Sequence, residues 1–285
     1  MEIQKYISEK VLKCPDCTDS ELVEGNATLC CNICHKKYDF HSGSAFFVNY
    51  EESPTHDSLD KIKTVFKKYP KLYGFLKNTV SPLYLKDDLG NFLKKYSHEN
   101  TKAINLGSGN FSVGKGVLNL DLINYDNVEI VSSLESLPFK DNTIDLITIN
   151  SVLEHVPHSE IVVAEMYRVL KPNGKIFVSV PFICGFHASP YDFNRWTREG
   201  VKVLFKDFKT IDLRAEGGPS SALLWVFQEW FATLFSFGSK NLFNLNYLII
   251  MLLTWPFKYL DIFMTKFPTS HHINSCFIYI GEKKD

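Results

Sequence analysis

From about residue 101 onward, short runs of apolar residues alternate with longer stretches in which apolar residues recur at helical spacing. The apolar runs have strand length and predict seven buried strands, at 103–106, 117–120, 128–131, 144–149, 176–180, 210–213 and 276–280. The clearest helical stretch is 159–170, and the Lys-Pro-Asn-Gly that follows predicts a helix end, with Gly174 available for a left-handed turn. Buried strands joined by such crossovers predict an α/β fold with a Rossmann-like, mostly parallel, seven-stranded sheet.

The first predicted strand runs directly into a glycine-containing turn, Asn105-Leu106-Gly107-Ser108-Gly109-Asn110. Glycines at this point let the backbone turn sharply and approach a ligand closely, because no Cβ stands in the way. The second strand ends in Asp121. A carboxylate there lies beside the same crevice, where it can accept hydrogen bonds from both hydroxyls of a ribose. The pattern therefore favours a nucleotide site, and a tight turn with a capping aspartate is the alternative.

Three further stretches, at 133–147, 152–156 and 165–174, resemble the middle of class I S-adenosylmethionine-dependent methyltransferases. Together with the glycine turn, the resemblance covers roughly residues 100–215 and the last strand. It implies S-adenosylmethionine as the cofactor, with the glycine turn facing its methionine part and the residues before Leu-Pro-Phe facing its adenine. The cofactor-binding residues that the resemblance implies are Asn105, Gly107, Ser108, Gly109, Asp121, Ser133, Leu134 and Asn150.

Three positions depart from the pattern of that family. Asn105 stands where an acid is usual, Phe111 replaces a third glycine, and Ser133 replaces an aspartate that commonly faces the adenine. Only residues 110–116 separate Gly109 from the next strand, so the helix that usually follows the first strand must be reduced to a turn. A branch of the family with Asn-Leu-Gly-Ser-Gly followed closely by Asn-Leu-Asp looks like this sequence.

A second polar cluster, at 187–197, follows the fifth predicted strand on the rim where α/β enzymes bind substrate. His187 is the candidate general base, Asp192 a candidate to orient it, and Arg195 a candidate to bind a phosphate or carboxylate. An Asp–Arg pair that only pins the loop is the alternative, because methyl transfer depends mainly on alignment of the acceptor. Glu154 and His155 follow the fourth strand and are expected to contact the cofactor edge or to support other side chains.

Four cysteines near the N-terminus form two Cys-x-x-Cys pairs with thirteen residues between them: Cys14 with Cys17, and Cys31 with Cys34. Paired units of this kind predict a structural Zn²⁺ site with four thiolate ligands, flanked by strands at 28–31 and 36–40. Cys30 offers an alternative second clip with Cys34, and buried thiols without metal are a further alternative. Residues 10–50 resemble the small zinc-ribbon proteins that activate or precede RNA and other methyltransferases, which implies a folding unit with a docking surface.

Residues 49–58 are rich in Pro, Ser and acidic residues and predict a linker. The following segment, 61–77, has six lysines and no acid, and Pro70 divides it into two predicted short helices. Its cationic, aromatic surface suits RNA or anionic lipid headgroups, and a solvated helix face is the alternative. The predicted organisation is a zinc-ribbon-like domain at 1–50, a linker with Lys-rich helices at 51–100, and a methyltransferase domain at 101–285.

An apolar insert at 217–267 contains 13 aromatic residues and only five charged ones. It predicts two helices, at 221–237 and 246–264, before the last strand. The uncharged stretch 241–257 is seventeen residues long, but its asparagines and Pro256 make it too short and too polar for a secure membrane span. We expect a hairpin that lies in a membrane interface, and the alternatives are a homodimer interface or a cover over the acceptor pocket.

The composition is ordinary for a folded chain, with 45% hydrophobic and 22% charged residues, and the net charge of −1 provides no overall positive field for nucleic acid. The first residues lack the apolar core of a signal peptide, so we expect a cytoplasmic protein, peripheral at most on the inner face of the membrane.

Together these features predict a methyltransferase that acts on an oxygen or nitrogen of a sugar, a lipid-linked molecule or another small-molecule acceptor. Two alternatives remain at this point. One is an RNA methyltransferase that uses the ribbon and the Lys-rich segment. The other is a non-catalytic scaffold with the same fold.

Overall fold

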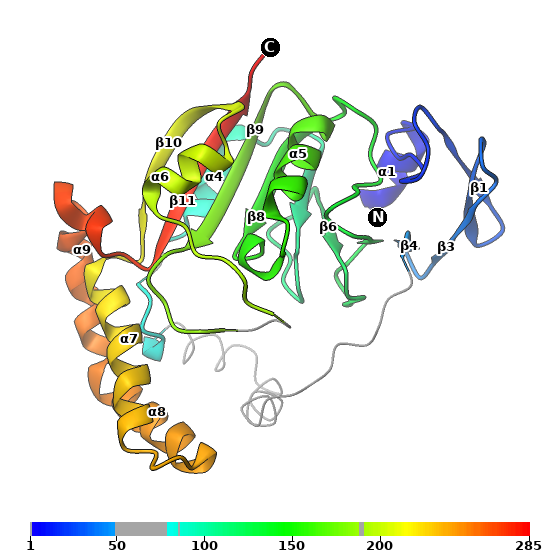
Figure 1. Cartoon of the computed structure of the whole chain (residues 1–285). Helices are drawn as coiled ribbons and strands as arrows, with labels where there is room; N and C mark the ends of the chain where they lie inside the picture. Colours follow the sequence, from blue (N-terminus) through cyan, green and yellow to red (C-terminus); the bar gives the residue numbers. More distant parts are fainter. Residues whose placement is uncertain (1, 49–78, 85, 188–190) are drawn as a thin grey trace.

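One mixed sheet with helices on both faces organises the chain (Figure 1), in a computed structural model that describes residues 2–48, 79–84, 86–187 and 191–285. The predicted linker and Lys-rich helices at 49–58 and 61–77 lie outside the described residues. The strands are β1 (Leu22–Gly25), β2 (Thr28–Cys31), β3 (Lys37–His41), β4 (Ser44–Phe46), β5 (Ala103–Leu106), β6 (Val117–Asp121), β7 (Ile130–Val131), β8 (Ile144–Asn150), β9 (Leu170–Pro181), β10 (Phe208–Glu216) and β11 (Cys276–Lys283). The helices are α1 (Glu2–Ser8), α4 (Asp88–Tyr96), η1 (Leu153–His155), α5 (Ser159–Val169), α6 (Arg198–Leu204), α7 (Pro219–Leu234), α8 (Lys240–Thr254), η2 (Trp255–Leu260), α9 (Asp261–Met264) and η3 (Pro268–His272).

The sheet has the order β1-β2-β3-β4-β7-β6-β5-β8-β9-β11-β10. From β7 to β9 all neighbouring strands are parallel, and β11 is antiparallel to both β9 and β10. This arrangement confirms the mostly parallel Rossmann-like sheet. Since β5 is flanked by β6 on one side and β8 on the other, the turn after β5 lies at the centre of the carboxyl edge, where such sheets bind ligands.

Each of the seven predicted strands of the main sheet is present. Several are longer than expected, whereas β7 covers only the second half of the predicted strand at 128–131. The strand β9 begins at Leu170, directly after α5, so the predicted helix end at 171–174 already belongs to a strand. The left-handed conformation there falls on Asn173, with a φ of 63°, and the expectation for Gly174 was wrong. A Cβ at position 174 would lie 2.8 Å from the Leu170 Cγ, which explains the glycine by close packing.

Helices cover both faces of the sheet, and each face has its own apolar cluster. Side chains of α4 pack with one set of strand residues, as in the contact between Phe92 and Phe177, whose ring centroids are 5.5 Å apart. Buried side chains of α1, α5 and α6 pack with the alternate residues of the same strands. A strand sends successive side chains to opposite faces, so nearly continuous apolar runs are what this double burial requires.

The N-terminal cysteine-containing strands extend the main sheet. The strand β4 pairs in parallel with β7, with Ala45 opposite Ile130 and Phe46 opposite Val131. The helix α1 packs against the main domain, where the hydroxyl of the buried Tyr6 donates a hydrogen bond of 3.0 Å to the Ala103 carbonyl. Figure 1 shows α1 and the strands β1, β3 and β4 at one end of the sheet, beyond β6. Packing of the cysteine-containing segment is therefore tied to the packing of the main domain.

The apolar insert between β10 and β11 forms a long helical hairpin that projects from the main domain (Figure 1). Two helices were predicted, and α7 and α8 confirm them with different bounds. The helical run Lys240–Met264 is long and apolar enough to cross a membrane, with a mean hydropathy of 1.4, and 17% of its most apolar window is buried. The expectation that the apolar stretch is too short for a span is thereby corrected, because η2 and α9 continue the helix past Pro256, as the predicted helix at 246–264 requires.

A half-buried carboxyl at the end of β10, that of Glu216, leads to a prediction about stability and pH. Burial raises the pKa of Glu216 to about 6, although the carboxyl accepts a hydrogen bond of 2.7 Å from the Ser179 hydroxyl. A raised carboxyl pKa favours the neutral form in the folded state. The stabilisation that this neutral carboxyl gives to the fold is fully present below pH 4.5, its ordinary pKa, and is lost as the pH rises through about 6. We expect Glu216→Gln to raise the free energy of unfolding by up to about 2 kcal/mol near neutral pH and to leave it unchanged near pH 4.

Chemical denaturation of both proteins at the two pH values measures this difference. Glu282→Gln is the matched control, since the side chains of Lys209 and Lys175 lower the pKa of Glu282 and its replacement should reduce stability near neutral pH. A Glu216→Gln variant that is no more stable than the wild type near neutral pH would contradict the prediction.

Candidate functional site

The turn after β5 has the sharp backbone that its glycines predict, and no helix separates β5 from β6. Gly107 has a φ of +66°, and a Cβ there would lie 2.5 Å from a methyl carbon of Val152. Gly109 has a φ of +55°, and a Cβ there would meet no atom within 4 Å. The two glycines therefore have different roles. Gly107 allows close packing against the segment after β8, whereas the Cβ position of Gly109 faces open space at the carboxyl edge of the sheet.

Asp121 lies at the end of β6 and turns its carboxylate toward this glycine turn. Its Oδ2 accepts a hydrogen bond of 2.7 Å from the Gly109 N–H, and its Oδ1 accepts one of 2.9 Å from the Ile123 N–H. The side chain is half-buried. Each carboxylate oxygen can accept more than one hydrogen bond, so acceptor capacity remains for the hydroxyls of a ribose. The residue thus lies at the predicted edge of the crevice, in contact with the predicted turn.

Asn105 lies beneath the turn in a row of polar side chains across three strands. Its amide oxygen accepts a hydrogen bond of 2.9 Å from the Thr148 hydroxyl on β8, and its amide nitrogen donates one of 3.2 Å to Asn119 on β6. All three side chains are buried. An ionised acid at position 105, as in the family pattern, would have no hydrogen to donate to the Asn119 amide oxygen. The Asn105 amide group supplies that hydrogen and so avoids the conflict.

The remaining predicted cofactor residues lie around the same edge. Ser108 is buried within the turn, and Asn150 is exposed at the end of β8. Ser133 and Leu134 follow β7 and are half-buried, and the Ser133 hydroxyl accepts a hydrogen bond of 3.2 Å from the Glu135 N–H. The structure thus gathers the predicted residues at the carboxyl ends of four adjacent strands.

The loop after β9 brings His187, Asp192 and Arg195 together, but not in the expected way. Asp192 forms a two-oxygen ion pair with the Arg195 guanidinium, which lowers the Asp192 pKa to about 2. It accepts a hydrogen bond of 3.0 Å from the His187 backbone N–H, and its Oδ2 is 3.9 Å from the His187 ring. Asp192 therefore holds the loop backbone in place and does not directly orient the imidazole. This is the loop-pinning arrangement that the sequence left as the alternative.

A residue to which sequence reasoning gave a minor part, Glu154, lies at the centre of this region. Its side chain is 0% exposed, and the loop that carries Asp192 folds over it, with the Phe193 N–H donating a hydrogen bond of 2.7 Å to the Glu154 carbonyl. The His187 Nε2 lies 3.5 Å from the Glu154 Oε1. Contact with the Cys184 thiol and with Glu154 raises the pKa of His187 to about 10.

The helix α7 of the apolar insert borders this loop through Trp225, which sequence reasoning missed. The indole and the His187 ring have centroids 5.7 Å apart. A Cβ at Gly185 would lie 2.6 Å from the indole nitrogen, so the loop backbone approaches the tryptophan closely. The glycine and the tryptophan are 40 residues apart in a sequence without a shared motif, and no local pattern indicates their contact.

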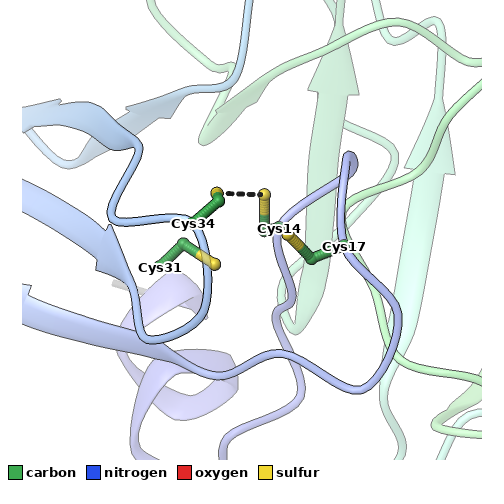
Figure 2. Close-up of side chains that lie close together, drawn as sticks. All are labelled: Cys14, Cys17, Cys31 and Cys34. Carbon is green, nitrogen blue, oxygen red and sulfur yellow. Dashed lines mark hydrogen bonds between the residues drawn. The ribbon is translucent and has the colours of Figure 1, made fainter.

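The four predicted metal-binding cysteines meet at one point (Figure 2). Their sulfur atoms all lie within 4.8 Å of one another, and the Sγ atoms of Cys14 and Cys34 are 3.8 Å apart. In a tetrahedral shell with Zn–S bonds of about 2.3 Å, two sulfurs are separated by about 3.8 Å, so the cluster fits zinc. Cys30 is outside the cluster, because its thiol faces the carbonyls of Cys31 and His35. The second clip is therefore formed by Cys31 and Cys34: Cys31 and Cys14 are buried, whereas Cys34 is exposed.

The strand order, the glycine turn and the acid that closes β6 define a class of protein, the Rossmann-like nucleotide-binding α/β domains. Within that class, residues 111–178 match the family model described as a methyltransferase domain. Residues 111–178 are thus similar to a methyltransferase domain.

Curated relatives match over short stretches. A demethylmenaquinone methyltransferase of Anoxybacillus flavithermus is 45% identical over 64 residues, which are 21% of this chain and 27% of that protein. A ubiquinone/menaquinone biosynthesis C-methyltransferase of Escherichia fergusonii is 51% identical over 53 residues, 18% of this chain and 21% of that protein. The chain thus spans about a quarter of the length of these relatives. Among solved structures, a phosphoethanolamine N-methyltransferase of Haemonchus contortus has a TM-score of 0.47 and 16% identity, covering 88% of this chain and 62% of that one.

Proposed function

We propose that the protein transfers the methyl group of S-adenosylmethionine to an oxygen or nitrogen of a small-molecule acceptor. The observation that carries the proposal is the contact between the Asp121 carboxylate and the Gly109 N–H, at a glycine whose Cβ position faces open space. This pairing supports a site in which the ribose hydroxyls meet the carboxylate while the sulfonium end lies against the turn. The matched methyltransferase residues, 111–178, run from this turn into β9.

S-adenosylmethionine supplies a methyl group bonded to a positively charged sulfur, and an acceptor lone pair attacks the methyl carbon from the side opposite that sulfur. The task of the protein is to hold the two reactants in line, since alignment accounts for much of the acceleration of such a transfer. Gly109 and Asp121 fix the cofactor side. The loop that carries His187, together with Trp225 on α7, forms the acceptor side. The ion pair of Asp192 with Arg195 keeps that loop in place. The general-base role proposed for His187 requires its neutral imidazole.

The acceptor that we propose is a sugar, a lipid-linked molecule or another membrane-associated metabolite. Support comes from the two faces of α7. Trp225 contacts the acceptor loop, whereas Leu223, Trp230 and Leu234 on the same helix are 61%, 57% and 51% exposed. The helix α8 adds further exposed side chains, such as Leu253 at 67%. Apolar side chains in such number are costly in water, and an interfacial hairpin that adjoins the site would bring an amphiphilic acceptor to it.

Calorimetric titration with S-adenosylhomocysteine tests the cofactor half of the proposal. Heat of binding with one site per chain is the expected result. A titration with no heat beyond dilution would contradict the proposal and favour the non-catalytic scaffold.

Flotation with vesicles of mixed neutral and anionic phospholipids tests the membrane half. The wild type should float with the vesicles. Leu253→Glu combined with Phe257→Glu should reduce the partition at least about 100-fold, because burial of each such side chain contributes about 1.5–3 kcal/mol. Val203→Glu is the matched control, since Val203 is 70% exposed on α6, outside the hairpin. Wild-type protein that stays entirely in the soluble fraction would contradict the membrane proposal, and a concentration-dependent dimer in light scattering would then favour the homodimer interface.

A further inference from the structure

The Glu154 carboxylate is buried, with 0% of the side chain exposed. Within the described part of the chain, neither Oε1 nor Oε2 receives a hydrogen bond. An ionised carboxylate removed from water costs several kcal/mol unless a cation or hydrogen-bond donors compensate for the lost solvation. The local structure, in which the chain after β8 enters η1 and the loop at 191–194 closes over it, holds Glu154 in this position all the same.

Two imidazoles face this carboxylate, and both have the same ring nitrogen tied to backbone. The His155 Nδ1 is 2.5 Å from the Tyr191 carbonyl, and the His187 Nδ1 is 3.2 Å from the Gly185 carbonyl. A carbonyl only accepts hydrogen bonds, so the His155 Nδ1 carries the hydrogen. The His187 Nδ1 lies between the Gly185 carbonyl and the Arg195 Nη2, which is 3.5 Å away, and it donates to the carbonyl in the tautomer that leaves Nε2 free for a metal. In the neutral rings, the Nε2 atoms then present lone pairs, and they lie 3.9 Å and 3.5 Å from the Glu154 Oε1.

Three electron-pair donors thus converge on one point. The ligand atoms of Glu154, His155 and His187 all lie within 4.8 Å of one another. Around a metal with bonds of about 2.1 Å, ligand atoms are about 3.0–3.4 Å apart, so small side-chain movements bring all three ligand atoms to bonding distance of one ion. We propose that Glu154, His155 and His187 bind one divalent first-row transition-metal ion, for which two imidazoles and a carboxylate are a suitable ligand set.

The surroundings of the three residues hold the ligand side chains in fixed orientations, as in known metal sites. Backbone carbonyls orient both imidazoles, as is usual for histidine ligands. The backbone N–H of His187 is held by Asp192, which Arg195 in turn fixes, so the loop that supplies this ligand is anchored. Val152, two residues before Glu154, packs against Gly107 and joins the metal-binding segment to the cofactor turn.

Three protein ligands leave coordination positions open for an acceptor. An acceptor hydroxyl that coordinates the ion loses its proton to water more readily. Its oxygen lone pair then forms the new bond to the methyl carbon, while the carbon–sulfur bond breaks and its electron pair stays on sulfur. In this arrangement His187 is a ligand through Nε2 and not the general base. Binding of the ion stands independently of the proposed function, whereas this role for it rests on that function.

Titration of the full-length, zinc-loaded protein with Mn²⁺ alone tests the site, with electron paramagnetic resonance measuring the free ion at each addition. Thiolates bind Mn²⁺ poorly compared with zinc, so the four-cysteine cluster should not compete. We expect one Mn²⁺ per chain in the wild type and an affinity at least about 100-fold lower in Glu154→Gln, because the only anionic ligand is lost. His158→Gln is the matched control: His158 and Glu160 form an exposed histidine–glutamate pair 3.4 Å apart, and its loss should leave the affinity unchanged.

A second variant and a second ion keep the test decisive. His187→Gln removes a ligand whose side chain is 33% exposed and should weaken binding even if Glu154→Gln does not fold. Co²⁺, followed by its visible absorption, replaces Mn²⁺ in a parallel titration. Binding of neither ion by the wild type, or equal binding in the wild type and both folded variants, would overturn the proposal. Each protein is also titrated with S-adenosylhomocysteine, so that failure of the metal site and failure of the cofactor site are seen separately.

Discussion

Replacing Cys14 with serine is expected to abolish stoichiometric zinc binding and to unfold the N-terminal strands. Cys14 is 0% exposed, and its sulfur is 3.8 Å from that of Cys34 and 2.9 Å from the Tyr38 hydroxyl. The strands β1 to β4 are only three to five residues long and have few buried side chains of their own. Structural zinc sites contribute about 10–16 kcal/mol of apparent binding free energy, so loss of the ion removes most of what holds such a small unit together.

Metal analysis and thermal unfolding of the purified proteins measure both effects. Cys30→Ser is the matched control, because this neighbouring thiol is half-buried but faces backbone carbonyls outside the cluster. The control should retain one zinc per chain and unfold at the wild-type temperature. Zinc lost from Cys30→Ser and kept in Cys14→Ser would show that the ligand set is wrong.

Replacing Asp121 with alanine is expected to weaken binding of S-adenosylhomocysteine by about 1–3 kcal/mol, or roughly 5- to 150-fold. The carboxylate accepts hydrogen bonds from the Gly109 and Ile123 N–H groups, so its loss also loosens the turn against which the cofactor would lie. Asp121→Asn keeps an oxygen acceptor of the same size but lacks the charge, and it should fall between alanine and the wild type.

Isothermal titration calorimetry gives the affinities directly. Asp126→Ala, five positions further along the same connection and exposed, is the matched control and should bind as the wild type does. Equal affinity in the wild type and in Asp121→Ala would remove this residue from the cofactor site.

The central strands were predictable because both of their faces are buried. The starts of β5, β6 and β8 at Ala103, Val117 and Ile144 coincide with the first residues of apolar runs, since a strand covered on both sides shows no polar alternation. The ends of the apolar insert helices were less predictable, because almost every position there is apolar. Local signals still existed: Pro219 stands at the start of α7, and the Ser239 hydroxyl accepts a hydrogen bond from the Leu242 N–H at the start of α8.

The candidate site likewise has one part that could be predicted from the sequence and another that could not. Gly109 and Asp121 are brought together by two adjacent parallel strands, so their relation follows from local sequence and sheet topology. The isolation of Glu154 depends on contacts from a loop almost forty residues away, where the Phe193 N–H reaches the Glu154 carbonyl. Likewise, the pairing of β4 with β7 depends on tertiary packing, because two short strands without a distinctive pattern contain no signal for their partner.

The parallel pairing of β4 with β7 also bears on solubility. With only Ile130 and Val131, β7 would end the main sheet as a short apolar edge if the cysteine-containing strands detached. Unpaired N–H and carbonyl groups on such an edge recruit strands from other molecules, and chains with this exposure aggregate. On this view bound zinc would limit self-association, and a shortage of the metal would deplete the protein through precipitation while its main domain was still folded.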